Sequence, residues 1–353
     1  MASPRLFRPL TLPTPDGSGL VVGNRAWIAP MCQYAVDRRD GVPTDWHVQH
    51  LGSFAAGGFG LVVAEATAVE ARGRISPQDL GLWDDDQVAG HARVVDVIHS
   101  QGRAAGVQLG HAGMKASTYP MLPGVDEGRV PAAEGGWPVL TAEEALADRD
   151  VVVQAFVDAT RRAEEAGYDV VQVHAAHGYL LHQALSPLVG GTSDATLLRD
   201  VVTAVREAWP ASRPLGVRVS ATDWVDGGVT VADTVAALEG LDVSWVDVSS
   251  GGLTDGSEIP VGPAYQTPLA AELARGVDDG VVVSAVGLIT EPAQAETILV
   301  TGLADAVSLG REALRDPHWA MRAARALRVP EDAARALRVP EDEVPRAPQF
   351  WRA

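Results

Sequence analysis

The stretch TAEEALADRDVVVQAFVDATRRAEEAGYDVVQVHAA, residues 141–176, contains one complete helix–strand unit. It begins with TAEE, a capping box that predicts the start of a helix. Phe156, Ala159 and Ala163 continue one apolar stripe, and Gly167 is typical of a helix end. The valine-rich run that follows is continuously apolar, which is typical of a strand in a parallel sheet covered on both faces.

The same kind of apolar run recurs along the chain, and segments with helical spacing separate the runs. We predict eight strands, at residues 26–32, 60–69, 103–113, 168–176, 214–222, 243–252, 281–289 and 304–310. Eight strand–helix alternations in 353 residues predict an α/β fold, a (β/α)8 TIM barrel. The alternative is a doubly wound sheet, but that fold usually needs fewer strands, and no G-x-G-x-x-G sequence opens a helix here.

Two further segments affect the domain organisation. Residues 119–140 are rich in glycine and proline, which predicts a long lid loop after the third strand. The sequence AARALRVPED occurs at 323–332 and again at 333–342, a duplication too short for a solenoid. We therefore expect a single barrel domain over residues 1–345 and a C-terminal tail over 346–353, which a subunit interface could cover.

The composition limits the possible partners. Hydrophobic residues make up 46% of the chain, enough for a sizeable core. The net charge of −18, from 28 basic and 46 acidic residues without a basic block, predicts no nucleic-acid and no membrane partner. No apolar run approaches the ~20 residues of a membrane span, and no signal-peptide core is recognisable at the start. The single cysteine, Cys32, excludes an internal disulfide, so we expect a cytoplasmic protein.

The ends of the last two predicted strands carry a phosphate-binding pattern. Gly287 ends the seventh strand, and Gly310 and Arg311 lie between the eighth strand and a helix start. Barrels bind phosphate after strands seven and eight, where a helix start offers unpaired amides and a positive dipole end. A lone arginine could be plain surface charge, but this combination favours a phosphate site.

The end of the fourth strand carries two histidines and a tyrosine. His174 and His177 could bind a metal together with His111, lie in the core, or hold a substrate oxygen. Three histidines do not by themselves specify a metal, and the H-E-x-x-H pattern is absent. Two neutral imidazoles can both donate hydrogen bonds to one oxygen, and Tyr179 is spaced to donate a proton nearby.

Taken together, the motifs resemble those of the old yellow enzyme family of flavin-dependent ene-reductases, in particular its thermophilic-like branch. The resemblance runs through essentially the whole chain. It is carried by LFRPL, NRAWIAPMCQY, VVAEATAV, GRISPQDLGLW, VQLGHAGMKAS, AGYDVVQVHAAHGYLLHQALSPL, GVRVSATDW, VDVSSGG, AVGLIT and SLGREALRDP, in that order.

The resemblance implies a noncovalent FMN cofactor and NAD(P)H as hydride donor. The matching FMN positions are Pro30, Met31, Cys32 and Ala66 along one side of the ring system, Gln108 and Arg218 at its polar edge, and Ser250, Gly287, Gly310 and Arg311 at the ribityl and phosphate groups. No metal is expected.

The resemblance also implies an enzyme that reduces the C=C bond of an α,β-unsaturated carbonyl or nitro compound. In the implied site His174 and His177 bind the carbonyl or nitro oxygen, Tyr179 donates the proton, and Tyr34, Lys115 and Arg352 contact the substrate. Arg352 would enter the pocket of a neighbouring subunit, so a homodimer or homotetramer is expected.

The sequence departs from the family pattern at three places. VGGTSDATLLRD replaces a longer stretch after the fourth strand, residues before the 141–167 helix are missing, and Met114 stands where arginine is common. The duplicated decapeptide also displaces the tail that bears Arg352. The alternatives are therefore a flavin-binding barrel with weak or altered activity, such as an oxidase or scaffold, and a metal-dependent hydrolase that uses the three histidines.

Overall fold

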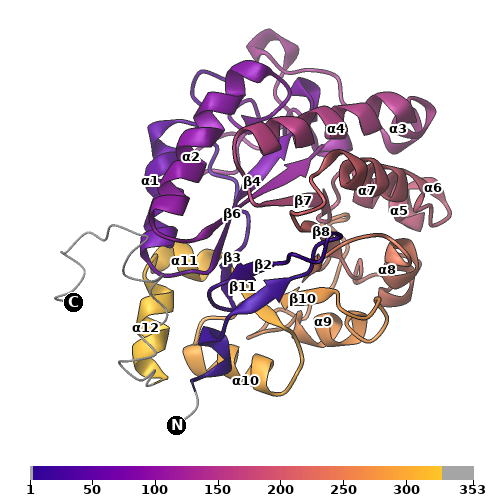
Figure 1. Cartoon of the computed structure of the whole chain (residues 1–353). Coiled ribbons are helices and arrows are strands. Elements are labelled where there is room, and N and C mark those ends of the chain that lie inside the picture. Colours follow the sequence, from indigo (N-terminus) through magenta and orange to yellow (C-terminus); the bar gives the residue numbers. More distant parts are fainter. Residues whose placement is uncertain (1–2, 328–353) are drawn as a thin grey trace.

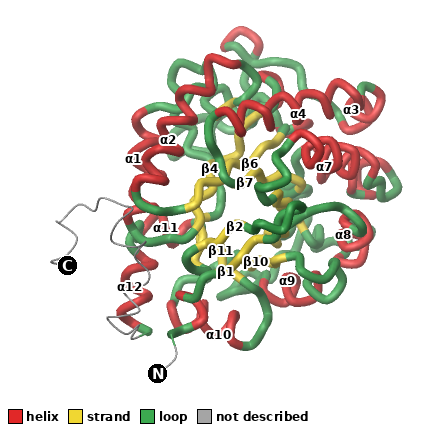
Figure 2. Tube along the Cα trace, viewed as in Figure 1, coloured by secondary structure: helices red, strands yellow, loops and turns green. Residues whose placement is uncertain are grey.

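The computed structural model describes residues 3–327 and contains a closed barrel of eight parallel strands surrounded by helices (Figures 1 and 2). The barrel order is β3-β11-β10-β9-β8-β7-β6-β4, and β3 also pairs with β4, which closes the ring. The barrel strands are β3 (Ala26–Ile28), β4 (Leu61–Ala68), β6 (Ala104–Gly110), β7 (Val170–Ala175), β8 (Leu215–Ser220), β9 (Trp245–Ser249), β10 (Val282–Ala285) and β11 (Ala306–Leu309). Each lies inside one of the eight predicted runs, so the predicted barrel is confirmed.

Helices follow the strands and form the outer layer. They are α1 (Asp45–Ala56), α2 (Val88–Ser100), α3 (Ala142–Ala147), α4 (Arg149–Glu165), α5 (Leu180–Leu185), α6 (Pro187–Gly190), α7 (Thr196–Ala208), α8 (Val231–Leu238), α9 (Thr267–Leu273), α10 (Pro292–Val300), α11 (Arg311–Arg315) and α12 (Trp319–Ala326). The capping box at Thr141 and Glu144 is present. The predicted helix after it is divided into α3 and α4, because Asp148 leaves helical geometry with ψ 33°.

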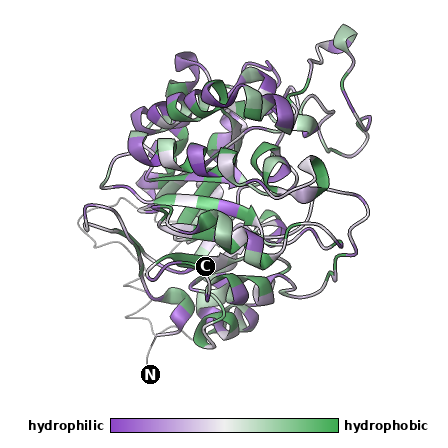
Figure 3. Cartoon of the chain, turned by 90° about the vertical axis from the view of Figure 1, so that its right-hand side faces the viewer, coloured by the Kyte–Doolittle hydropathy of each residue, from purple (hydrophilic) through white to green (hydrophobic). Residues whose placement is uncertain are grey.

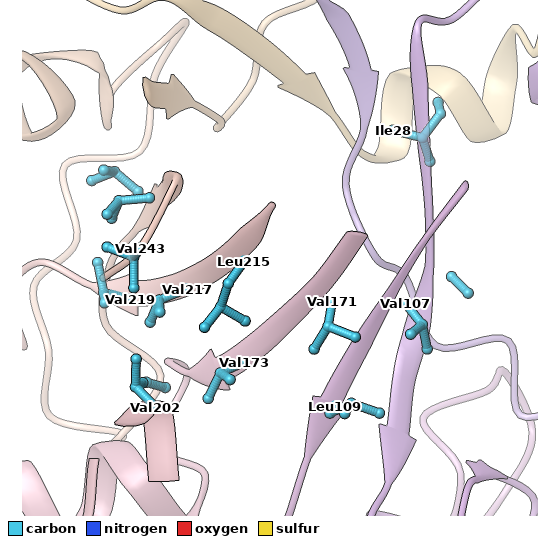
Figure 4. Close-up of a cluster of buried hydrophobic side chains, with 14 of the residues drawn as sticks. Ile28, Val107, Leu109, Val171, Val173, Val202, Leu215, Val217, Val219 and Val243 are labelled. Carbon is cyan, nitrogen blue, oxygen red and sulfur yellow. The ribbon is translucent and has the colours of Figure 1, made fainter. Parts of the chain in front are cut away.

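Alternation along the strands separates an apolar outer face from a more polar interior. Val107, Leu109, Val171 and Val173 are fully buried and pack in one cluster with Val202 of α7, between the sheet and the helices (Figure 4). Figure 3 shows mostly hydrophobic strands at the centre of the molecule and helices of mixed hydrophobic and hydrophilic residues around them. The few polar residues within the apolar runs therefore mark the inside of the barrel.

An N-terminal hairpin that the sequence analysis did not predict covers the amino-terminal end of the barrel (Figure 1). It consists of the antiparallel strands β1 (Leu10–Leu12) and β2 (Leu20–Val22). Leu12 and Val22 pack against Trp27 and Trp245, whose rings meet edge to face at a centroid distance of 5.2 Å. This apolar plug leaves the carboxyl-terminal end as the rim on which a site can form.

The predicted lid, residues 119–140, has little regular structure and is attached to that rim. In this lid, the indole N–H of Trp137 (Nε1) donates to the carbonyl of Arg72 at 2.7 Å. The guanidinium of Arg74 lies 4.7 Å from the centre of the Trp137 ring. Val139 packs against the same buried cluster as Tyr179, so the lid covers part of the rim.

Several sequence predictions concern residues beyond 327. The predicted tail at 346–353, Arg352 and the second copy of AARALRVPED lie outside the described residues, so the domain boundary at 345 stays a prediction. In the described part, no helix is both long and apolar enough to cross a membrane.

Burial of His91 predicts a pH-dependent stability. His91 is fully buried in α2, with Nδ1 2.8 Å from the Tyr168 hydroxyl and Nε2 3.1 Å from the Gly81 carbonyl. Burial lowers its pKa from 6.5 to about 4. The unfolded chain therefore takes up a proton that the folded chain does not, and stability falls as the pH drops from about 6.5 toward 4.

We expect His91→Gln to reduce this loss by about 2 kcal/mol between pH 7 and pH 4.5. Glutamine can still donate to Gly81 and accept from Tyr168, but it cannot titrate. Urea unfolding of both proteins at the two pH values measures the difference. Equal losses of unfolding free energy in the wild type and the variant would contradict a neutral, buried His91.

Candidate functional site

The centre of the rim is the turn that follows β7. His174 is the last but one residue of the strand, and His177 and Gly178 then adopt left-handed conformations, with φ 60° and φ 71°. A left-handed non-glycine residue is uncommon and is frequent at functional sites. The turn brings the ring centroids of His174 and His177 to 5.3 Å, and those of His174 and Tyr179 to 5.0 Å. The three predicted catalytic side chains therefore form one cluster.

The surroundings keep both histidines neutral. Burial and the nearby Arg218 guanidinium lower the pKa of His174 and of His177 well below the usual value. His177 Nε2 lies 2.7 Å from the Ser249 hydroxyl, while Nδ1 of the buried His174 has no hydrogen-bond partner among the described residues. A buried polar atom without a partner is costly, and a water or a ligand atom at this position would satisfy it.

Tyr179 has an apolar environment beside the histidines. Tyr179, like Cys32 and Ala66, packs against a buried cluster of Ile75, Ala112 and Ala116. The family resemblance predicts that Cys32 and Ala66 lie at the flavin ring. Burial raises the pKa of Tyr179 well above 10, and the nearby Cys32 and Tyr34 add smaller contributions in the same direction. The phenol therefore keeps its proton at neutral pH. Burial likewise raises the pKa of Cys32 well above its usual value, so this thiol is also protonated. Tyr34 is buried with φ 52°, a second strained residue at the site.

A cavity of about 220 Å³ opens beside this cluster, between the ends of β3, β8, β9, β10 and β11. Six of the ten predicted cofactor-binding residues line it: Pro30, Met31, Arg218, Gly287, Gly310 and Arg311. A smaller cavity of about 10 Å³, enough for one water, is lined by Ala66, His174 and Tyr179 among others. The predicted cofactor and catalytic residues therefore share one rim.

Three arginines line the larger cavity, and because Arg315 is paired with Glu312, Arg218 and Arg311 remain to bind an anion. Arg218 is buried and forms an ion pair through Nε with Asp247 Oδ2 at 3.2 Å, which leaves its terminal nitrogens available. Within residues 3–327, Arg311 has no ion-pair or hydrogen-bond partner. The neighbouring Glu312 is held by Arg315 at 3.2 Å and by Arg322 at 3.6 Å, so its charge is largely offset. The cavity can therefore hold an anion.

Six predicted residues in the described part line neither cavity: Cys32, Tyr34, Gln108, Lys115, His177 and Ser250. Of these, Gln108, Ser250 and Lys115 are held by side-chain hydrogen bonds. Gln108 Nε2 donates to Gln172 Oε1 at 2.7 Å inside the barrel. The Ser250 hydroxyl donates to Gln266 Oε1 at 2.6 Å. The Lys115 ammonium donates to the carbonyl of His177 at 3.0 Å, and also to that of Gly252. Lys115 thus supports the backbone of the turn after β7.

Several wall residues of the larger cavity were missed by the sequence analysis: Ser249, Tyr265, Gln266 and Ser308. Ser249 was recognisable, because it stands next to Ser250 at a strand end. Tyr265 and Gln266 come from an irregular segment between β9 and α9, where no periodic pattern marks their return to the rim. Gln266 Nε2 donates to the carbonyl of Val286 at 3.0 Å, which fixes the segment to β10.

His111 lines the same small cavity as His174, but its ring nitrogens contact other groups. Its Nδ1 accepts from the Gly113 amide at 3.0 Å, and its Nε2 lies 3.4 Å from Glu70 Oε2. Arg72 Nε binds the same carboxylate oxygen at 2.6 Å. Within the described residues, no group of three or more His, Cys, Asp or Glu side chains has an arrangement that could hold a metal ion.

Comparison with known proteins identifies the family of this chain. The sequence model of the NADH:flavin oxidoreductase / NADH oxidase family matches residues 5–329. The chain belongs to this family, the family of old yellow enzyme. It is therefore an enzyme, an oxidoreductase of the old yellow enzyme type that acts on small molecules.

Other members of the old yellow enzyme family resemble the chain over most of its length. The NADPH dehydrogenase of Listeria innocua is 45% identical over 319 residues, which cover 86% of this chain and 91% of that protein. The NADPH dehydrogenase of Geobacillus thermodenitrificans is 42% identical over 342 residues, 93% of this chain and 96% of that protein.

Solved structures of other proteins share the fold. The old yellow enzyme homologue of Zymomonas mobilis superposes with a TM-score of 0.72 at 23% identity, over 98% of this chain and 100% of that one. Morphinone reductase superposes with a TM-score of 0.71 at 20% identity, over 97% and 95% of the two chains. At this level of identity the likeness concerns the barrel alone.

Proposed function

We propose that the protein is an FMN-dependent NADPH dehydrogenase that reduces the activated C=C bond of α,β-unsaturated carbonyl or nitro compounds. The observation that carries the proposal is the position of the neutral His174, His177 and Tyr179 cluster beside a cavity lined by Arg218 and Arg311. The relatives named NADPH dehydrogenase support NADPH as the reductant.

The residues around the cavity fit FMN. Arg311 lacks a partner within residues 3–327 and would bind the phosphate, next to Gly310 and Gly287. The terminal nitrogens of Arg218 would donate to the polar edge of the ring system, and Gln108 lies nearby inside the barrel. Pro30 and Met31 offer an apolar wall to the ring faces. Bound FMN would accept a hydride from NADPH and supply it to the substrate.

The protein supplies position and polarisation. The neutral imidazoles of His174 and His177 would donate hydrogen bonds to the substrate oxygen, on which negative charge develops as the C=C bond is reduced. The protonated Tyr179 phenol would donate the proton to Cα. The lid and the buried Tyr34 would limit the access of bulk water to this position, which would strengthen the hydrogen bonds.

We also propose that the protein forms a homodimer or homotetramer in which Arg352 contacts the substrate pocket of a neighbouring subunit. The support is the pair of aromatics, Phe350 and Trp351, beside Arg352 at the end of the chain, since aromatic residues and arginine are enriched at interfaces.

We expect Arg311→Ala to weaken FMN retention by about tenfold or more, because the change removes a charge-assisted donor to the phosphate. Titration of the FMN-free protein with FMN, followed by flavin fluorescence, measures the dissociation constant. Arg161→Ala on α4 is a matched control, because Arg161 is an exposed arginine paired with Asp158 at 3.2 Å and does not line the cavity.

The same preparations test the proposal as a whole. NADPH should bleach the flavin absorbance of the wild type, and cyclohexenone should restore it with formation of the saturated ketone. A colourless protein that does not bind added FMN would contradict the proposal. Flavin bleaching without reduction of any enone or nitroalkene would favour the alternative of a flavin-binding barrel with altered activity.

A further inference from the structure

The turn between the two catalytic side chains His177 and Tyr179 needs support from outside. His177 and Gly178 are consecutive left-handed residues, with φ 60° and φ 71°. The turn also packs tightly, because a Cβ on Gly178 would overlap the backbone of Gly252 and lie 2.7 Å from Leu253 Cα. Left-handed geometry at a non-glycine residue is unfavourable and persists only where surrounding groups hold it.

Two side chains of the helix that follows hold both backbone groups of Gly178. The Gly178 amide donates to His182 Nδ1 at 2.9 Å. The Gly178 carbonyl accepts from Gln183 Nε2 at 2.6 Å. Both residues are buried in α5, one turn beyond Tyr179. The peptide groups that set the directions of His177 and Tyr179 are therefore fixed by side chains and not by regular secondary structure.

His182 is in turn held by Asp223, which follows β8. Both are fully buried, and His182 Nε2 lies 3.0 Å from Asp223 Oδ1. The angle of this contact is too bent for a well-formed hydrogen bond. Within the described residues, however, neither His182 Nε2 nor Asp223 Oδ1 has another hydrogen-bond partner. The second oxygen, Asp223 Oδ2, accepts from the Ser186 hydroxyl and from the Val229 amide, both at 2.8 Å.

These contacts fix which ring nitrogen of His182 carries the proton. The amide of Gly178 can only donate, so Nδ1 must be unprotonated. The proton of the neutral ring is then on Nε2, where it faces the Asp223 carboxylate.

We propose that His182 and Asp223 are positioning residues of the active site: Asp223 holds the Nε2–H tautomer of His182, so that Nδ1 holds the Gly178 amide and thereby places His177 and Tyr179. The proposal rests on the proposed function, because it assigns its effect to the substrate-reducing step.

The variant Asp223→Asn reverses the hydrogen-bond pattern with little change in shape. The backbone amide of Val229 can only donate, so the oxygen of the new side chain must stay at the Oδ2 position. Its NH2 group then faces His182 Nε2. Either two N–H groups meet there, or the His182 proton moves to Nδ1 and meets the Gly178 amide. Both outcomes leave a buried donor unpaired and loosen the turn.

Two measurements on D223N follow. With ¹⁵N-labelled histidine, NMR should show the Nε2–H tautomer of His182 in the wild type and either the Nδ1–H tautomer or a changed Nε2 signal in D223N. In stopped flow, cyclohexenone should restore the flavin absorbance about ten- to a hundredfold more slowly, since misplacement by about 1 Å can cost that much. FMN affinity should be unchanged.

Ser186→Ala is the matched control. It removes one donor to Asp223 Oδ2 but leaves the carboxylate facing His182, so tautomer and rate should be retained. If D223N does not fold, His182→Asn and His182→Ala replace it. Asparagine can still accept from Gly178 and should retain more activity than alanine.

Several results would overturn the proposal. They are an Nδ1–H or charged His182 in the wild type, a D223N rate equal to that of the wild type, or equal slowing by D223N and S186A. The NMR result does not depend on FMN or substrate. If the wild type shows the expected tautomer but reduces no enone, the proposed function fails and the hydrogen-bond assignment stands.

Discussion

Replacing either His174 or His177 by alanine should slow the restoration of flavin absorbance by cyclohexenone by about a hundred- to a thousandfold, the usual loss for one donor to a developing oxyanion. Burial and the neighbouring Arg218 lower the pKa of both histidines, so both are neutral across the physiological range. A neutral imidazole donates one hydrogen bond, and that bond strengthens as charge builds on the substrate oxygen.

The bleaching of flavin by NADPH should be less affected, because the substrate oxygen takes no part in that step. Stopped-flow traces of each step separate the two effects. The matched control is His99→Ala. His99 is a partly exposed histidine that pairs with Asp169 at 2.8 Å, at the amino-terminal end of β7 and therefore at the end of the barrel opposite to the rim.

Two outcomes would count against the assignment. Equal slowing of both steps in H174A and H177A points to a general structural defect. Activity that requires an added divalent metal would revive the alternative of a hydrolase that uses His111 with the pair.

The barrel was predictable because its strands are buried on both faces. Each strand therefore reads as an apolar run with at most two polar residues, and residues such as Gln172 and Arg218 mark the inside of the barrel. The barrel topology brings such strand ends together at one rim, whatever their separation in sequence. This is why Gly287 and Arg311 could be placed at one cavity before the structure was known.

Contacts made by irregular segments were not predictable in the same way. Gln266 reaches the cavity from a loop without periodicity. His182 and Asp223 lie on segments that follow neighbouring strands, and only the loop conformations bring them to 3.0 Å. The hairpin β1–β2 did carry a signal, the Asp16–Gly17 pair between two short apolar runs, and Gly17 adopts the left-handed φ of 78° that such a turn requires.

Replacing Tyr179 by phenylalanine should lower the rate of saturated-ketone formation by about a hundred- to ten-thousandfold, the range for loss of a positioned general acid. The ring of Tyr179 packs against His174 and against the buried cluster of Ile75, Ala112 and Ala116, and phenylalanine keeps both contacts. The change therefore removes the proton donor without removing the packing.

The product carries a second signature of this role. In D2O the wild type should place deuterium on one face of Cα, because the phenol exchanges its proton with solvent and is held in one position. In Y179F the slow residual protonation would come from water, and the facial preference at Cα should be lost. Mass spectrometry and NMR of the saturated ketone measure the amount and the face of the label.

Tyr119→Phe is the matched control for this experiment. Tyr119 is a lid residue whose hydroxyl donates to Glu134 Oε2 at 2.8 Å, so the same atom is removed at a position away from the histidine pair. Y119F should retain both the rate and the facial preference. If Y179F also retains them, the proton comes from another group, and the assignment of Tyr179 as the acid must be abandoned.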